Sequence, residues 1–248
     1  MELTREFGQL NQIIKVDLHI HTKASEYKDH HIVENSTKEN LDVIFEKLQE
    51  NRINLFAFAD HNRFDKDIFL EAWKKIDSKR YPSILNILPA VEFDVCVDAG
   101  KPACHILTIF HVTAESDLDK IVNGIASDEL KNENDFYSRS NFENLLRAIG
   151  LPVLLIAAQR GALSNPHVGG RSLSDSCDDV IHFLKTGYIS ALEYQKPKVE
   201  GMLLSALVEM KELWMVAMVA GSDCHDWTVY PKHYLADSNR GEESRSFK

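Results

Sequence analysis

Apolar and β-branched residues along this chain gather into seven short runs. The runs occupy residues 13–20, 54–59, 87–95, 106–112, 152–158, 189–194 and 215–220. Runs of this length and composition predict β-strands. Between most of them, apolar residues recur at helical spacing, which predicts helices around residues 41–48, 68–76 and 199–213. Strands that alternate with helices favour a mainly parallel α/β sheet, with active residues at the carboxyl ends of the strands.

Two segments interrupt this alternation. Too few residues separate Val95 from His105 for a crossover helix, and residues 98–102 have a turn-forming composition. The two strands on either side are therefore expected to form a hairpin. Residues 127–141 are polar and rich in Asn, Asp, Glu and Ser, which predicts an exposed loop or a frayed helix.

Composition and charge narrow the class of protein. A chain of 248 residues with 44% hydrophobic content suits one domain, expected at residues 1–236, followed by a polar, disordered tail at residues 237–248. The net charge of −10 supplies no chain-wide positive field for a polyanion. The four cysteines lack CxxC spacing, and no signal peptide or bilayer-spanning apolar run is present. We expect a cytoplasmic protein that makes no contact with a membrane.

Histidines and acids stand at the ends of several predicted strands. The first strand leads into Asp17-Leu18-His19-Ile20-His21, where His19 and His21 share a face of an extended chain and can bind one ion. The candidates at other strand ends are Asp60, His61, Glu92, Asp223 and His225. Imidazole and carboxylate together suit Zn, Mn or Fe, and such mixed sites leave coordination positions open for water. The pattern predicts a catalytic metal site rather than a structural zinc site.

The predicted hairpin gives an independent check on this site. If its turn is centred between Asp98 and Ala99, Glu92 and His105 face each other directly across the two strands and could share an ion. The alternative for His105 is an ordinary histidine of a sheet.

Taken together, five segments resemble the motifs of the polymerase and histidinol phosphatase (PHP) family of metal-dependent phosphoesterases. They are DLHIHT at 17–22, ADHN at 59–62, PAVEF at 89–93, HILTIF at 105–110 and GSDCH at 221–225. The resemblance implies a distorted seven-stranded (β/α)7 TIM-like barrel, the PHP fold, with two or three divalent ions in its cleft. By this resemblance the ligands of the first ion would be His19, His21, Glu92 and Asp223, with Glu92 bridging. His61 and His225 would serve the second ion, and Glu92 and His105 the third.

Two positions depart from the family pattern. The family often has a further histidine shortly after its first motif, but residues 23–27 read KASEY here, so Glu26, Asp29 or a later histidine is a candidate for the second ion. A histidine is also expected after the fifth strand, where this chain has Gln159. An amide oxygen binds Zn or Mn much more weakly than imidazole does. The third site is therefore expected to be weak, empty or completed by His167.

Within the family, the chain looks most like the N-terminal module of TrlF-like fusion proteins, in which a coiled-coil ATPase follows. The segments that carry this narrower resemblance are FAFADHN, LPAVEFDV and LLIAAQRGAL. It implies a nucleic-acid end as substrate and an ATPase module as partner, whereas the acidic net charge favours a small phosphorylated molecule.

The expected reaction is hydrolysis of a phosphate ester by a metal-activated water. Two ions about 3.5 to 4 Å apart lower the pKa of a bridging water and neutralise the phosphoryl oxygens. Asp60 is expected to orient the ring of His61. Arg63 and Arg160 follow the candidate ligands closely and are candidates for binding a substrate phosphate.

Two other functions stay open at this point. Gln159 is compatible with a degenerate module that binds metal without catalysis and has a docking or regulatory role. A metal-dependent amidohydrolase on a similar barrel also uses an HxH motif and a late Asp, but it typically bridges its ions with a lysine, where this chain offers Glu92.

Overall fold

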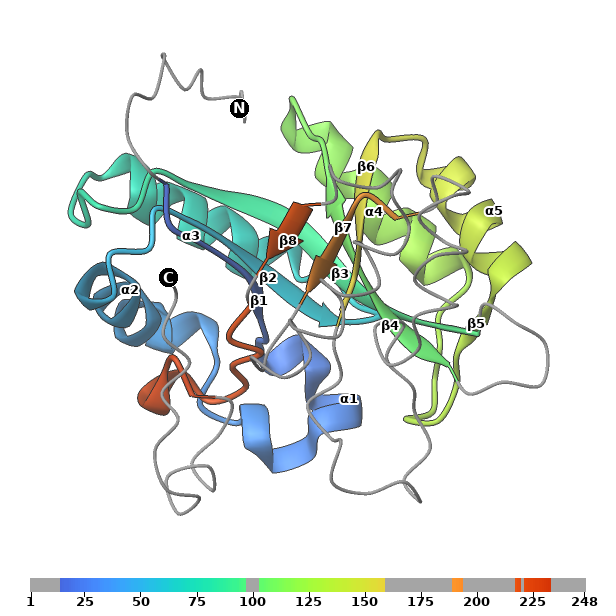
Figure 1. Cartoon of the computed structure of the whole chain (residues 1–248), viewed down its shortest axis with the longest axis horizontal. Helices are drawn as coiled ribbons and strands as arrows, with labels where there is room; N and C mark the ends of the chain where they lie inside the picture. The colour runs from blue at the N-terminus through green and yellow to red at the C-terminus, as the bar shows by residue number, and fades with distance from the viewer. Residues whose placement is uncertain (1–13, 97–102, 159–188, 194–216, 220, 233–248) are drawn as a thin grey trace, which may run out of the picture.

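The computed structural model describes residues 14–96, 103–158, 189–193, 217–219 and 221–232, which fold into a curled sheet with helices packed against it (Figure 1). The strands are β1 (Val16–Ile20), β2 (Leu55–His61), β3 (Asn86–Cys96), β4 (Cys104–Phe110), β5 (Tyr137–Ser138), β6 (Val153–Ala157), β7 (Ala191–Glu193) and β8 (Ala217–Val219). The α-helices are α1 (Glu26–Asp29), α2 (Leu41–Glu50), α3 (Lys66–Asp77), α4 (Glu115–Ser127) and α5 (Arg139–Ile149). Short 3-10 helices lie at Lys23–Ser25, His30–Val33, Lys38–Asn40 and Trp227–Val229.

The sheet follows the order β1-β2-β3-β4-β6-β7-β8, and β5 pairs with β3. Strand β4 is antiparallel to both of its neighbours, and the other pairs are parallel. Each of the seven predicted runs overlaps one strand, so the predicted mainly parallel α/β sheet is confirmed.

The predicted hairpin is present, but its register differs from the expected one. Glu92 lies opposite Leu107, and His105 lies opposite Asp94. The pairing is therefore centred one residue later than a turn between Asp98 and Ala99 requires, and the turn itself lies outside the described residues. Because the partner moves by two residues, His105 keeps the same face as Glu92, diagonally across the two strands.

Both faces of the sheet are buried, and they differ in residue size. One face carries a cluster of small and aliphatic side chains that includes Ala57, Ala59, Ala90, Leu107 and Ile156. The other face is rich in aromatic side chains and packs against α2, α3, α4 and α5. Figure 1 shows these helices outside the curled sheet, so the face with the small residues is its inner one.

A β-bulge in β1 changes which side chains point inward. Asp17 pairs with Phe56 but Ile20 pairs with Phe58, so three steps along β1 match two along β2. Leu18 accordingly belongs to the inner cluster, whereas Ile20 belongs to the outer one. A bulge reverses the alternation of side chains in this way, and it lets the histidines after Leu18 face the inside.

The helices agree with the sequence pattern in part. The stripes expected around residues 41–48 and 68–76 form α2 and α3. The helix expected at 199–213 lies outside the described residues. The loop expected at 127–141 is only partly right, because α4 ends at Ser127 while β5 and the start of α5 occupy residues 137–141.

The segment after β8 returns to the end of β1. An isolated parallel bridge joins Ile20 to Cys224, and the His21 N–H donates to the Cys224 carbonyl at 2.8 Å. This contact brings the first and last motifs of the sequence together. Among the helices of the described residues, none is long and apolar enough to cross a bilayer.

Candidate metal centre

The predicted ligands converge at the carboxyl ends of the parallel strands. His19 is in β1, His61 ends β2, and Glu92 is in β3 directly beside His61. All seven predicted ligands are buried: His19, His21, His61, Glu92, His105, Asp223 and His225. The structure thus brings these seven residues together.

The first group of donors consists of His19, His21 and Asp223, with Glu92 beside it. The Nε2 of His19 lies 3.3 Å from Glu92 Oε1 and 3.4 Å from Asp223 Oδ1. The Nε2 of His21 lies 3.3 Å from the same Asp223 oxygen and 3.6 Å from Glu92 Oε2. Two atoms that bind the same ion at about 2.1 Å lie roughly 3.0–3.5 Å apart, so these separations suit ligands of one ion.

Hydrogen bonds determine which ring nitrogen of His19 and of His21 is available to bind an ion. The Nδ1 of His19 contacts Glu193 Oε1 at 2.9 Å, and the Nδ1 of His21 contacts Ser25 Oγ at 3.1 Å. Ser25 gives its only hydroxyl proton to Asp60 at 2.9 Å, so the His21 Nδ1 must be the donor. Both rings therefore keep a proton on Nδ1, and Nε2 is the nitrogen that each ring turns toward the first group.

The second group consists of His21, Asp29, His61 and His225. Asp29 Oδ1 lies 3.5 Å from His61 Nε2, and Asp29 Oδ2 lies 3.3 Å from His225 Nε2. The His225 Nδ1 donates to the Asp223 carbonyl at 2.9 Å, which leaves its Nε2 for a ligand. Asp29 stands at the end of α1 and supplies the carboxylate that this group needs.

The third group consists of His61, Asp94 and His105. His105 Nε2 lies 3.1 Å from Asp94 Oδ1, and its Nδ1 contacts Glu92 Oε1 at 2.6 Å. Asp94 is a residue that the sequence analysis missed. The signal was available, because residues two apart on a strand share a face, and Asp94 follows Glu92 by two.

Glu92 lies between the three groups. Its carboxylate contacts rings of the first group at 3.3 and 3.6 Å, the Nδ1 of His61 at 2.9 Å and the Nδ1 of His105 at 2.6 Å. A carboxylate in this position is suited to bridge ions.

Burial and opposite charge compete in setting the protonation of these groups. Burial alone would raise the pKa of Glu92, but the surrounding histidines, above all His105 and His19, hold it well below its usual value. Burial likewise would lower the pKa of His19, but the carboxylates around it raise it well above its usual value. In His21, burial dominates and lowers the pKa to about 3. Glu92 is thus ionised and His21 neutral, which are the forms that bind a cation.

Several donor atoms of the centre are buried with no hydrogen-bond partner among the described residues. They are Nε2 of His19, His21 and His105, Nδ1 of His61, Oε2 of Glu92 and Oδ2 of Asp29. A buried polar atom without a partner costs free energy, so it indicates a ligand that the protein is built to bind. Nitrogen and carboxylate donors without thiolates suit Zn, Mn or Fe. The residues present therefore fit a cluster of divalent ions.

A second layer of residues holds the ligands in place. Asp17 is fully buried, and its Oδ1 accepts from the backbone N–H groups of His19 at 3.2 Å and Ser222 at 3.1 Å. Its Oδ2 accepts from the Tyr230 hydroxyl at 2.8 Å. One carboxylate thus ties the strand that carries His19 to the loop that carries Asp223.

Asp60 supports the centre by a different route from the expected one. It accepts from the Thr22 N–H at 2.6 Å, the Thr22 hydroxyl at 2.8 Å and the Ser25 hydroxyl at 2.9 Å, and none of these contacts is with the ring of His61. Through Ser25 it fixes the ring of His21, and the same Ser25 oxygen accepts from the His61 backbone N–H at 3.0 Å. Asp60 therefore acts on both histidines through Ser25. Burial raises the pKa of Asp60 to about 7.

The remaining predicted residues divide into three cases. Glu26 is more than half exposed and pairs with Lys23 at 3.8 Å, so Asp29 rather than Glu26 lies beside the histidines. Arg63 pairs with Glu129 at 2.5 Å and stacks over the Tyr27 ring at 4.8 Å, and its role in binding substrate stays a prediction. Gln159, Arg160 and His167 lie outside the described residues.

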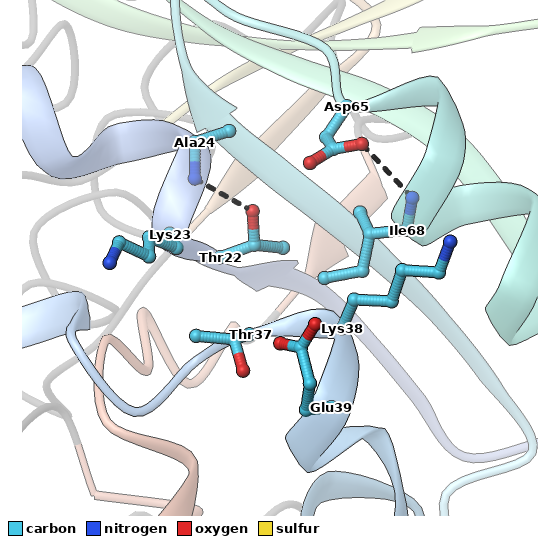
Figure 2. Close-up of a pocket in the computed structure, with 8 residues that line it drawn as sticks. All are labelled: Thr22, Lys23, Ala24, Thr37, Lys38, Glu39, Asp65 and Ile68. Atoms are coloured by element: carbon cyan, nitrogen blue, oxygen red, sulfur yellow. Dashed lines mark hydrogen bonds between the residues drawn. The ribbon is translucent and has the colours of Figure 1, made fainter.

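A hollow of about 350 Å³ lies beside the segment that follows β1 (Figure 2). Figure 2 shows its lining residues, which are Thr22, Lys23, Ala24, Thr37, Lys38, Glu39, Asp65 and Ile68. Its lysines and acids balance in charge, and no residue of the three donor groups lines it. The hollow is therefore distinct from the three donor groups.

Comparisons with known proteins return distant structural likenesses. No family model matches the chain, and no curated protein does. A structure described as a "putative metal-dependent phosphoesterase" from Bifidobacterium adolescentis has a TM-score of 0.49 at 15% identity, over 96% of this chain and 98% of that one. PsfC from Pseudomonas syringae has a TM-score of 0.49 at 13% identity, over 87% and 78%. An amidohydrolase from Chromobacterium violaceum has a TM-score of 0.48 at 13% identity, over 85% and 87%. Likenesses at this level assign neither a family nor an activity to this chain.

Proposed function

We propose that this chain is a metal-dependent hydrolase, and more narrowly a phosphoesterase that cleaves a phosphate ester with a metal-activated water. One observation carries the proposal: the Nε2 atoms of His19 and His21 are buried, lack hydrogen-bond partners in the described residues, and lie beside the oxygens of Glu92 and Asp223. An arrangement of this kind suits a bound cation better than a purely structural network.

The chain's own residues prepare the centre for this reaction. Glu193 and Ser25 contact the Nδ1 atoms of His19 and His21, so each ring turns its Nε2 toward the ion site without reorientation. Burial of the ligands removes competing water and strengthens their electrostatic interactions. Bound divalent ions would lower the pKa of a coordinated water and neutralise charge on the phosphoryl group.

The central carboxylate favours a phosphoesterase over an amidohydrolase. Glu92 contacts histidines of all three groups, and this is the bridging position that a lysine typically occupies in the amidohydrolase alternative. Three donor groups can bring several positive charges to one place, which suits a substrate that is itself negatively charged.

The finer features of this assignment are part of the proposal. We propose the distorted seven-stranded barrel of the PHP family, supported by the strand order and by the Ile20–Cys224 bridge between the first and last segments. The proposed substrate is a phosphorylated small molecule or a nucleic-acid end. An ATPase module is a proposed partner, and it would supply positive charge that a chain of net charge −10 lacks.

The test is metal-dependent hydrolysis by the purified chain. After loading with Mn²⁺ or Zn²⁺, a generic phosphodiester and a phosphomonoester are offered, with His19→Ala as the inactive variant and His111→Ala as the matched control. His111 is an exposed histidine outside the three donor groups. We expect His19→Ala to lose at least about 100-fold in turnover, since it removes a direct ligand and even supporting residues are worth about 10–100-fold. His111→Ala should match the wild type.

Two results would redirect the proposal. Hydrolysis of a simple amide but of neither ester would favour an amidohydrolase. Bound metal without turnover of any substrate would favour the non-catalytic module, and a gain of turnover in Gln159→His would then identify an impaired active site instead.

A further inference from the structure

The ammonium group of Lys28 lies at the third donor group. Its Nζ is in direct contact with Asp94 Oδ2, and both side chains are almost buried, with 14% and 6% of their surfaces exposed. Asn62 holds the same carboxylate in place, because its Nδ2 donates to Asp94 Oδ2 at 2.7 Å and its Oδ1 accepts from the Asp94 N–H at 2.9 Å. The Asp94–Lys28 pair is therefore fixed in the centre rather than formed by two mobile surface side chains.

There are too few histidine nitrogens to supply every ligand of three ions. His61 belongs to both the second and the third group, but a neutral imidazole has one lone pair. If His61 uses Nε2 for an ion beside Asp29 in the second group, it is lost to the third group. The described donors left there are His105, Asp94 and Glu92, and Glu92 also contacts the other groups. The third position is thus the poorest in donors among the described residues.

It is also the position where a positive charge already resides. Asp94 is the one carboxylate of the group formed with His61 and His105, and Lys28 neutralises it. A divalent ion beside His105 and Asp94 would lie close to the Lys28 ammonium in a site of low dielectric, where like charges repel strongly. Within the described part of the chain, the ion pairs of Glu92 and Asp29 are with histidines, and neither carboxylate pairs with a lysine or an arginine.

We propose that the centre holds two divalent ions, and that the ammonium group of Lys28 takes the place of a third one by neutralising Asp94. The inference rests on the metal-binding part of the proposed function and makes it more specific. It assigns a role to Lys28, which lies outside the sequence motifs that carry the candidate ligands. It also predicts two metal ions per chain.

The experiment counts metal ions per chain. The full chain is stripped with a chelator, saturated with Zn²⁺ or Mn²⁺, freed of excess metal and analysed for its metal content. The wild type should hold two equivalents. Lys28→Met should gain a third equivalent, because Asp94 is then free to bind an ion, and the double variant Lys28→Met/Asp94→Asn should return to two.

Three further variants control for charge, for position and for folding. Lys28→Arg keeps the cation and should stay at two equivalents. Lys23→Met removes an exposed lysine of the neighbouring turn, which pairs only weakly with Glu26 at 3.8 Å, and should also stay at two. Lys28→Gln provides a second neutral substitution if Lys28→Met does not fold, with thermal unfolding as the check.

Three equivalents in the wild type would overturn the inference, and so would two equivalents in both neutral Lys28 variants. These results leave the proposed hydrolase standing. A wild type that holds two ions but hydrolyses no phosphate ester would instead refute the phosphoesterase while leaving the role of Lys28 intact.

Discussion

At the scale of single residues, three histidines of the centre are held in the same way. His19, His21 and His225 each donate from Nδ1, to Glu193, Ser25 and the Asp223 carbonyl respectively. Nε2 is therefore the nitrogen that each ring has available for an ion. A histidine whose proton is fixed by a partner loses little freedom when it binds a metal, so these partners should matter almost as much as the ligands.

The contact between Glu193 and His19 gives the first prediction. Glu193→Ala removes the acceptor of the Nδ1 proton, and we expect metal affinity to fall by about 10–100-fold. Glu193→Gln keeps an acceptor oxygen and should lose less. Competition with a chromophoric metal indicator measures both, with the exposed Glu39→Ala as control. Equal affinities in all four proteins would show that Glu193 does not act on His19.

Gly221 gives a second prediction, because its lack of a side chain leaves room for the contact between Glu193 and His19. A Cβ at this position would overlap the carboxylate of Glu193 and lie 2.7 Å from the Cβ of His19. Gly221→Ala should therefore destabilise the fold by about 1–3 kcal/mol and weaken metal binding. Urea unfolding measures the first effect. In a Glu193→Ala background the same substitution should cost less, and an equal cost in both backgrounds would contradict the proposed clash.

The sequence predicted most of the residues that converge in the three donor groups, but few of the residues that hold them in place. HxH spacing and acids at strand ends identify His19, His21, Glu92 and Asp223 without knowledge of the fold. Glu193 lies near the end of the apolar run 189–194 and could have been recognised. The role of Ser25 could not, because it depends on a three-dimensional contact with Asp60, 35 residues away in the chain.

At the scale of elements, the alternation of side chains along a strand predicted which face of the sheet a residue occupies. It did not predict the register between neighbouring strands. The seven apolar runs gave the strands, yet the β3–β4 pairing is centred one residue later than expected because turn composition does not fix the length of a connection. The β1 bulge was also not predicted, since it depends on how β1 pairs with β2. The helix α4 was missed, although Leu118, Ile121 and Ile125 follow helical spacing and are buried.

The packing of α4 against α5 yields a third prediction. A Cβ at Gly124 would overlap Cγ1 of Ile149 and lie 3.2 Å from its Cδ1. Gly124→Ala should destabilise the protein by about 1–3 kcal/mol, even though alanine favours a helix over glycine by roughly 1 kcal/mol. Chemical denaturation of Gly124→Ala tests this, with the exposed Asn123→Ala on the same helix as control.

The matching double variant separates overpacking from other causes. In an Ile149→Ala background the added methyl group fills space, so Gly124→Ala should become neutral or stabilising there. A destabilisation of the same size in both backgrounds would argue against a clash between these two helices.

At the scale of the whole molecule, acidic groups are concentrated at one end of the sheet. The carboxylates buried there are Asp17, Asp60, Glu92, Asp94, Glu193 and Asp223. Burying ionised carboxylates costs several kcal/mol each unless opposite charge is close by. Lys28 supplies that charge for Asp94. For Glu92 and Asp223, in a chain of net charge −10, bound divalent ions are the natural source.

Removing metal should therefore lower the stability of the whole molecule. A ligand present at 100 times its dissociation constant adds about 2.7 kcal/mol to the free energy of unfolding. We expect a chelator to lower the melting temperature of the metal-loaded wild type in a scanning measurement. The double variant His19→Ala/His21→Ala should respond much less, and equal shifts in both proteins would mean that the stabilising metal binds elsewhere.

The most direct measurement is the amount of Zn²⁺ or Mn²⁺ that stays bound to the purified chain after dialysis, compared between the wild type and His19→Ala. The account predicts about two equivalents in the wild type and at least one fewer in His19→Ala, because the first donor group loses a direct ligand. A wild-type chain that retains no metal, or a His19→Ala variant that retains as much as the wild type, would contradict it.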